Sequence, residues 1–212
     1  MRGCGAFGKL PCAGDFIRFD LPADFVEVWD TWLQGEIAAA RDQWGARWQG
    51  CYMSAPIWRF SIAPAVAGGH GMIGILMASV DRVGRQFPLT LATVCPAPHG
   101  AVHLNARAWF ERLEDIALAA LDDLPLEALK GRLAGVAPPV AARVTPTHGG
   151  SILAGAEDLA PALGAAPAFA APAVWSARTE SDMRLMSGTG LPQGGDFAAL
   201  FDLDAPVWQV AR

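Results

Sequence analysis

Residues 72–94 read Met-Ile-Gly-Ile-Leu-Met-Ala-Ser-Val-Asp-Arg-Val-Gly-Arg-Gln-Phe-Pro-Leu-Thr-Leu-Ala-Thr-Val. Two apolar runs, 72–80 and 89–94, enclose a segment that contains Asp81, Arg82 and Arg85. Short apolar runs bounded by turn residues predict buried strands. Because only 17% of the chain is charged, three charges between two core strands indicate that they hold a structure together or bind something.

The composition limits the class of protein. The 212 residues are 52% apolar and carry a net charge of −5, which excludes disorder and argues against a nucleic-acid partner. The N-terminus lacks the apolar region of a secretory signal, and prolines interrupt the longest apolar stretch, 159–175, so no membrane span is expected. We therefore expect a cytoplasmic protein with one α/β domain over residues 1–212. Its parts are a motif-rich half over 1–95, a loop-rich segment over 134–172 and a less patterned part over 173–212.

Hydrophobic periodicity predicts the elements. Apolar residues at three- and four-residue spacing predict the longer helices, and apolar runs predict the strands. The expected helices cover 23–48, 105–122, 126–133, 157–163 and 196–201. The expected strands cover 3–10, 57–63, 72–80, 87–94, 173–177, 184–186 and 207–210. The Gly-x-Gly-x-x-Gly pattern at 3–8 has no preceding strand, so it favours a glycine-rich strand over a dinucleotide-binding loop.

A second group of charged residues lies near Gly14 and includes Lys9, Asp15 and Arg18. One interpretation is a solvated turn in which Asp15 caps its own loop. The other is that Asp15 or Lys9 joins the Asp81 group across neighbouring strand ends, where loops of α/β proteins commonly form sites. The sequence leaves both interpretations open.

Arg59 alternates with Trp58 and Phe60 in an expected strand, which predicts a buried guanidinium. A buried charge requires a hydrogen-bonded partner of opposite charge. The candidate partners are Asp30 and Asp81.

Three roles remain open for Asp81, Arg82 and Arg85. They can form a structural ion-pair network, an anion or phosphate site built on guanidinium groups, or a contact with another protein. We expect Asp81 and Arg82 to form a buried staple between strands and Arg85 to reach outward. Ser79, Asp81 and His70 are the residue types of nucleophilic catalysis, but the Gly-x-Ser-x-Gly motif is absent. We predict no catalytic residues, no metal site, no cofactor and no small-molecule substrate.

Six short motifs over residues 5–95 can be compared with known families. They read Gly-Lys-Leu-Pro at 8–11, Gly-Asp-Phe at 14–16, Trp-Asp-Thr-Trp-Leu at 29–33, Pro-Ile-Trp-Arg-Phe at 56–60, Ser-Val-Asp-Arg-Val-Gly-Arg at 79–85 and Phe-Pro-Leu-Thr at 87–90. In order and spacing they resemble the TagF family, also called ImpM, of type VI secretion system accessory proteins. Beyond residue 110 the resemblance is weak.

The resemblance implies a fold and a function. The implied fold is a three-layer α/β sandwich with a central mixed sheet flanked by helices on both sides. The implied function is non-enzymatic, post-translational repression of type VI secretion through binding of a forkhead-associated-domain scaffold, within the threonine-phosphorylation pathway. The family-motif residues proposed for an interaction or a structural network are Lys9, Asp15, Asp30, Arg59, Ser79, Asp81, Arg82 and Arg85. The alternative function is a small-anion or phospho-ligand module that uses Arg59, Arg82 and Arg85.

Overall fold

The computed structural model describes residues 3–95, 99–122, 124–139, 145–146, 152–153, 171–180 and 182–210. Most of the loop-rich segment expected over 134–172, and the whole helix expected over 157–163, lie outside the described residues. Within the described part of the chain, no helix is both long and apolar enough to cross a lipid bilayer.

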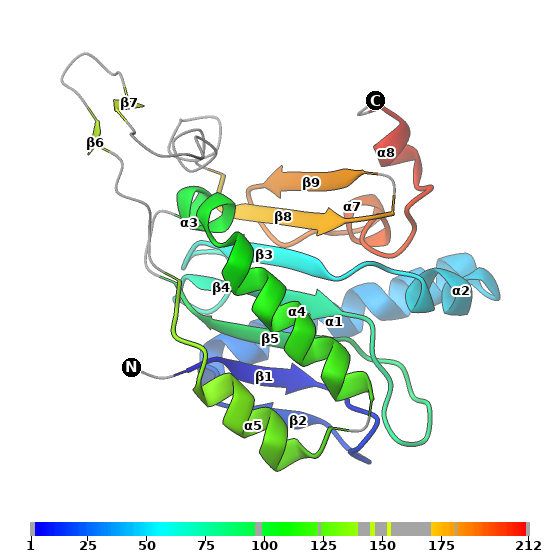
Figure 1. Cartoon of the computed structure of the whole chain (residues 1–212). Coiled ribbons are helices and arrows are strands. Elements are labelled where there is room, and N and C mark those ends of the chain that lie inside the picture. The colour runs from blue at the N-terminus through cyan, green and yellow to red at the C-terminus, as the bar shows by residue number, and fades with distance from the viewer. Residues whose placement is uncertain are drawn as a thin grey trace.

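One seven-stranded sheet organises the described structure (Figure 1). Its spatial order is β2-β1-β5-β4-β3-β8-β9. The strands are β1 (Gly5–Gly8), β2 (Ile17–Phe19), β3 (Trp58–Ile62), β4 (Met72–Met77), β5 (Leu89–Val94), β8 (Ala173–Arg178) and β9 (Met183–Gly188). Two short strands, β6 (Thr145–Pro146) and β7 (Ile152–Leu153), pair separately.

The predicted fold class, a three-layer α/β sandwich with a mixed sheet, is wrong. Every neighbouring pair in the seven-stranded sheet is antiparallel. The physical reason lies in the length of the connections. Residues 78–88 join β4 to β5 as a hairpin, with a bridge between Val80 and Gln86. Such a short connection makes the two strands antiparallel, because parallel neighbours need a longer crossover. The architecture is an antiparallel sheet with helices packed against it.

Helices pack against the sheet (Figure 1), and two clusters of hydrophobic side chains attach them to it. One contains residues of α1 (Ala23–Trp44), α2 (Arg47–Met53), α7 (Gly195–Ala198) and α8 (Pro206–Val210). The other contains residues of α3 (His99–Asn105), α4 (Arg107–Leu121) and α5 (Leu126–Ala134). Strand side chains alternate between faces, so Trp58, Phe60 and Ile62 belong to the first cluster.

Some elements differ from the sequence expectation. The helix expected over 23–48 ends at Trp44, because Gly45 adopts a φ of 50° and a new helix starts at Arg47; glycine tolerates this left-handed conformation. The strand expected over 207–210 is wrong, since these residues lie in α8. The elements β2 and α3, three and seven residues long, were not expected, and neither were the two-residue strands β6 and β7 in the segment expected to be loops. All four are too short for a clear periodic signal.

Candidate functional site

The hairpin between β4 and β5 is closed by the carboxylate of Asp81. Its Oδ1 accepts the backbone N–H groups of Val83, at 3.1 Å, and Arg85, at 2.9 Å. The Asp81 N–H donates to the Arg85 carbonyl at 3.1 Å, and the Gly84 N–H donates to the Asp81 carbonyl at 2.9 Å. One side chain therefore fixes the backbone of the whole turn.

The other carboxylate oxygen of Asp81 binds two cations. Oδ2 lies 3.1 Å from Lys9 Nζ and 2.6 Å from Arg85 Nε. The side chains of Asp81 and Lys9 are 0% and 9% exposed, whereas that of Arg85 is 60% exposed. Burial alone raises the pKa of Asp81, but the Arg85 N–H, Lys9, the Arg85 guanidinium and the Val83 N–H outweigh it. The pKa of Asp81 is therefore held well below its usual value, and the carboxylate stays ionised.

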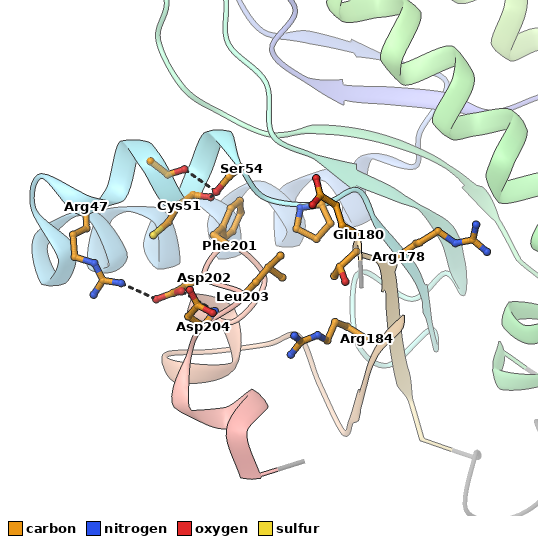
Figure 2. A pocket seen from close by; sticks show the side chains of 13 residues that line it. Arg47, Cys51, Ser54, Arg178, Glu180, Arg184, Phe201, Asp202, Leu203 and Asp204 are labelled. Atoms are coloured by element: carbon orange, nitrogen blue, oxygen red, sulfur yellow. Dashed lines mark hydrogen bonds and ion pairs between the residues drawn. The ribbon is translucent and has the colours of Figure 1, made fainter. Parts of the chain in front are cut away.

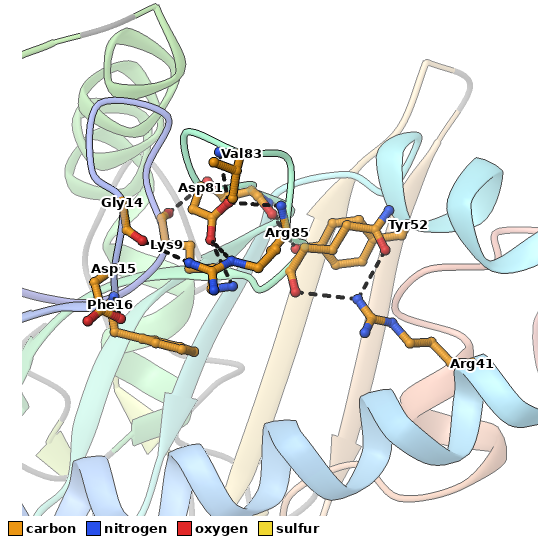
Figure 3. Close-up of polar contacts among 11 residues, drawn as sticks. Lys9, Gly14, Asp15, Phe16, Arg41, Tyr52, Asp81, Val83 and Arg85 are labelled. Atoms are coloured by element: carbon orange, nitrogen blue, oxygen red, sulfur yellow. Dashed lines mark hydrogen bonds and ion pairs between the residues drawn. The ribbon is translucent and has the colours of Figure 1, made fainter.

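The same turn is attached to the loop that follows β1 (Figure 3). Arg85 Nη2 donates to the Gly14 carbonyl at 2.8 Å, and the Arg82 N–H donates to the Ala13 carbonyl at 3.0 Å. Lys9 Nζ lies 5.2 Å from the ring centroid of Phe16, within cation–π distance. Two motifs that are some seventy residues apart in sequence thus form one structural unit.

The structure assigns different roles to Lys9 and Asp15. Lys9 joins the Asp81 group, and its carbonyl accepts the Ser79 hydroxyl at 2.8 Å. Asp15 is exposed, and its Oδ1 accepts the Phe16 N–H at 2.8 Å. The interpretation as a solvated turn therefore applies to Asp15, and the interpretation as a link to the Asp81 group applies to Lys9.

Asp81 and Arg82 were expected to form a buried staple between strands, and this expectation is wrong for Arg82. Arg82 is exposed. Its backbone N–H donates to the Ala13 carbonyl, and its guanidinium lies beside Gly14, where an added Cβ would be 3.1 Å from Nη2. Lys9 occupies the buried cationic position instead. Arg85 extends toward solvent, as its exposure shows, yet it remains bound to Asp81.

A buried tyrosine supports the hairpin from α2. The Tyr52 hydroxyl donates to the Ser79 carbonyl at 2.7 Å and accepts the Ser79 N–H at 3.0 Å. Burial raises the pKa of Tyr52 above its usual value, so the hydroxyl stays protonated. Sequence reasoning missed this residue, although it is the only tyrosine in the chain.

Arg59 has a partner that was not predicted. Its Nε and Nη2 donate to the two carboxylate oxygens of Glu114 on α4, at 2.6 and 2.8 Å, and its guanidinium lies 5.4 Å from the ring of Phe110. The predicted partners Asp30 and Asp81 are wrong. Asp30 lies on α1, and its Oδ1 is buried without a hydrogen-bond partner among the described residues.

The three arginines of the predicted small-anion site do not converge. Arg59 faces α4, on the opposite side of β3 from the Trp58 side chain, which stacks on Trp208 of α8. Arg85 opens into a cleft beside α1 and α2. An anion site that uses Arg59, Arg82 and Arg85 together is therefore wrong.

The nucleophilic residue types also lie apart. Ser79 is bound to the Lys9 carbonyl, and His70 Nε2 lies 3.6 Å from Asp24 Oδ2. Another histidine, His103, is buried between two serines: Nδ1 is 3.1 Å from Ser61 Oγ and Nε2 is 2.8 Å from Ser176 Oγ. Burial, and secondarily the positive charge of Arg59, lowers the pKa of His103 from 6.5 to about 3. His103 is therefore neutral at physiological pH.

A larger pocket, of about 780 Å³, lies between α2, the β8–β9 turn and residues 201–204 (Figure 2). Its charges are of both signs: Arg47 Nη2 pairs with Asp202 Oδ2 at 3.2 Å, and Arg184, whose guanidinium lies 5.1 Å from the Trp208 ring, pairs with Asp182 at 3.0 Å. Arg178 adds a third arginine to the lining, but Glu180, Asp202 and Asp204 line the same pocket. This mixture of charges makes the pocket a weaker candidate than the Asp81 turn.

Comparisons with known proteins show which sequences and structures this chain is similar to. A sequence model described as "TagF N-terminal domain, Type VI secretion system-associated" matches residues 5–136. The crystal structure of PA0076 from Pseudomonas aeruginosa PAO1 is similar, with a TM-score of 0.79 and 34% identity over 95% of this chain and 94% of that chain. A comparison with curated protein sequences finds no match. The matched span is more than half of the chain and includes the Asp81 turn and both segments attached to it, so the protein belongs to the TagF family, associated with type VI secretion.

Proposed function

We propose that this protein is a non-enzymatic, cytoplasmic regulator of type VI secretion that represses the machine after its components are made. It acts by binding a forkhead-associated-domain scaffold protein in the threonine-phosphorylation pathway of the system. Membership of the TagF family, whose matched domain is described as type VI secretion system-associated, supports the association with the machine.

The observation that supports a binding role is a group of exposed side chains whose backbone is held by the buried Asp81 network. We call the outer side chains of Phe16, Arg82 and Val83 the motif surface. Phe16 and Val83 are 43% and 71% exposed, and Arg82 is exposed. The Asp81 carboxylate accepts the Val83 N–H, and the Arg85 guanidinium donates to the Gly14 carbonyl, so the backbone beneath these side chains is fixed. A rigid surface loses little conformational entropy on binding, and arginine and aromatic residues are enriched at binding hot spots.

The test is binding of purified wild-type and variant protein to the scaffold protein of the same secretion system, measured by calorimetry. We expect Arg82→Ala and Val83→Ser each to weaken binding by about tenfold or more. Because both side chains point away from the core, the free energy of unfolding should change by no more than about 0.5 kcal/mol.

Matched controls exist on α4. Arg107→Ala makes the same exchange as Arg82→Ala, and Leu118→Ser likewise replaces an exposed aliphatic side chain by serine, Leu118 being 50% exposed. Both should leave scaffold binding unchanged. Equal losses in the test and control variants would contradict the motif surface as the contact. Absence of any binding by the wild-type protein would contradict the proposed function itself.

A further inference from the structure

A cationic cleft adjoins the Asp81 turn and is separate from the motif surface. It has a volume of about 470 Å³ and is lined by Lys9, Arg41, Gln49, Gly84, Arg85 and Gln86. These residues come from the end of β1, from α1, from α2 and from the hairpin, so only the tertiary structure brings them together. No carboxylate lines the cleft among the described residues.

The charges around the cleft do not balance. Lys9 and Arg85 share the single carboxylate of Asp81. Arg41 donates its hydrogen bonds to a neutral residue, Gln86, at 3.4 Å from its carbonyl and 3.2 Å from its side-chain oxygen, and has no carboxylate partner among the described residues. Three cations and one carboxylate leave a surplus of two positive charges. This surplus is local, because the chain as a whole carries a net charge of −5.

Several hydrogen-bond donors in the cleft bind no other group among the residues that the structure describes. Arg85 uses Nε for Asp81 and Nη2 for the Gly14 carbonyl, which leaves Nη1. Arg41 uses Nη2 for Gln86, which leaves Nε and Nη1. Lys9 Nζ has three N–H groups and is held by Asp81 and the ring of Phe16.

Arg41 is held in place by its surroundings (Figure 3). Its guanidinium lies 5.7 Å from the ring of Trp48, and the Gln86 side-chain oxygen that it binds also accepts the Trp48 Nε1–H at 2.7 Å. Arg41 and Arg85 are thus positioned before any ligand arrives, which reduces the entropy lost on binding.

We propose that this cleft is an anion site that takes a phosphoryl group, either as free phosphate or as a small phosphate monoester. A phosphate dianion matches the surplus of two positive charges, and its oxygens can accept hydrogen bonds from both guanidinium groups and the ammonium group. A carboxylate would neutralise only half of the surplus.

The probe is inorganic phosphate, titrated calorimetrically into the full chain at constant ionic strength, since salt screens unspecific attraction. We expect saturable binding with one site per chain. Arg41→Gln should weaken it by about tenfold or more, the loss expected for one charge-assisted contact. Arg41 is the residue to change because it is exposed and does not bind Asp81, so the variant keeps the buried network.

Arg107→Gln is the matched control: it removes the same charge from α4, where Arg107 pairs with Glu111 at 2.9 Å, and should bind phosphate like the wild type. Glycerol phosphate and acetate complete the panel. Tighter binding of glycerol phosphate assigns the site to a monoester, and equal or weaker binding assigns it to free phosphate. The proposal is overturned if phosphate does not bind, if Arg41→Gln binds it as tightly as the wild type does, or if acetate binds as tightly as phosphate.

Discussion

At the scale of single residues, Asp81 shows how a buried carboxylate can organise a turn without losing its charge. Its two oxygens receive two backbone N–H groups, one ammonium group and one guanidinium group, and together these interactions outweigh the cost of burial. The consequence is structural: the only carboxylate of the hairpin is buried and not available to a ligand, whereas its cationic partners keep donors that bind no other group among the described residues.

His103 gives a prediction for the pH dependence of stability. Its pKa is about 3 in the folded protein and near 6.5 when unfolded, so the unfolded chain binds the proton more tightly between these values. Stability should therefore be complete above pH 6.5 and fall as the pH drops toward 3, with a slope that approaches about 1.4 kcal/mol per pH unit for this one group. Urea unfolding at a series of pH values measures the slope.

The matching variant is His103→Gln, which removes the titrating group and keeps an amide that can bond the two serines. Between pH 6.5 and 5.5 its stability should depend less on pH than that of the wild type. Asp81 and Glu111, whose pKa values are also lowered in the folded protein, are mostly ionised in the unfolded chain in this window. Identical slopes in the two proteins would show that His103 is not the group responsible.

At the scale of elements, the central hairpin depends on the close approach of β4 and β5. Gly74 pairs with Ala92, and a Cβ added to Gly74 would overlap the Leu91 carbonyl oxygen and lie 2.6 Å from the Ala92 Cβ. Strand spacing is fixed by the backbone hydrogen bonds, so the sheet cannot easily widen to accept a methyl group.

We expect Gly74→Ala to destabilise the protein by about 3 kcal/mol, the upper part of the range for overpacking. Gly35→Ala is the control: Gly35 is exposed on α1, and an added Cβ meets nothing within 4 Å. This second exchange should stabilise the protein by about 0.5–1 kcal/mol through helix propensity. Thermal unfolding of the two variants measures whether each exchange raises or lowers stability. If Gly74→Ala left the stability unchanged, it would contradict the close packing described for β4.

At the scale of the whole molecule, the hydrophobic core extends beyond the span matched by the family model, residues 5–136. Trp175 of β8 stacks on Trp29 of α1, with centroids 5.9 Å apart and planes 8° apart. Trp32 and Trp58 donate their indole N–H groups to the carbonyls of Pro192 and Leu200, both at 2.7 Å. The described C-terminal residues therefore contribute to the same core as α1 and β3, and the single domain over residues 1–212 stays a prediction.

A fragment of residues 1–136 should fail to fold cooperatively. It would expose the edge of β3 that pairs with β8 over five residues, and it would uncover the tryptophan cluster around Trp29. Near-ultraviolet circular dichroism and thermal unfolding of the fragment test this, with the full chain as reference. Addition of residues 137–212 as a separate chain should restore the signal in part. A sharp, native-like transition of the fragment alone would establish two domains instead.

Local sequence patterns predicted most elements because they report local physics. The spacing of apolar residues located α4, α5 and the central strands to within a few residues, and the charged segment at 81–85 identified the hairpin that the family motifs share. The mixed sheet was wrong because strand direction depends on how the segments pair. Pairing is set by connections and packing over the whole chain, which hydrophobic periodicity does not encode.

The sequence by itself determined the strands on either side of the charged hairpin, the family and the residue types that the site uses. The tertiary structure alone decided which charged side chains lie together. Lys9, and not Arg82, is buried against Asp81; Glu114, and not Asp30, binds Arg59; and Arg41 joins Lys9 and Arg85 at one cleft. The physical reason is that secondary structure follows from neighbours along the chain, whereas electrostatic partners are chosen by proximity in space and by the need to satisfy each buried charge.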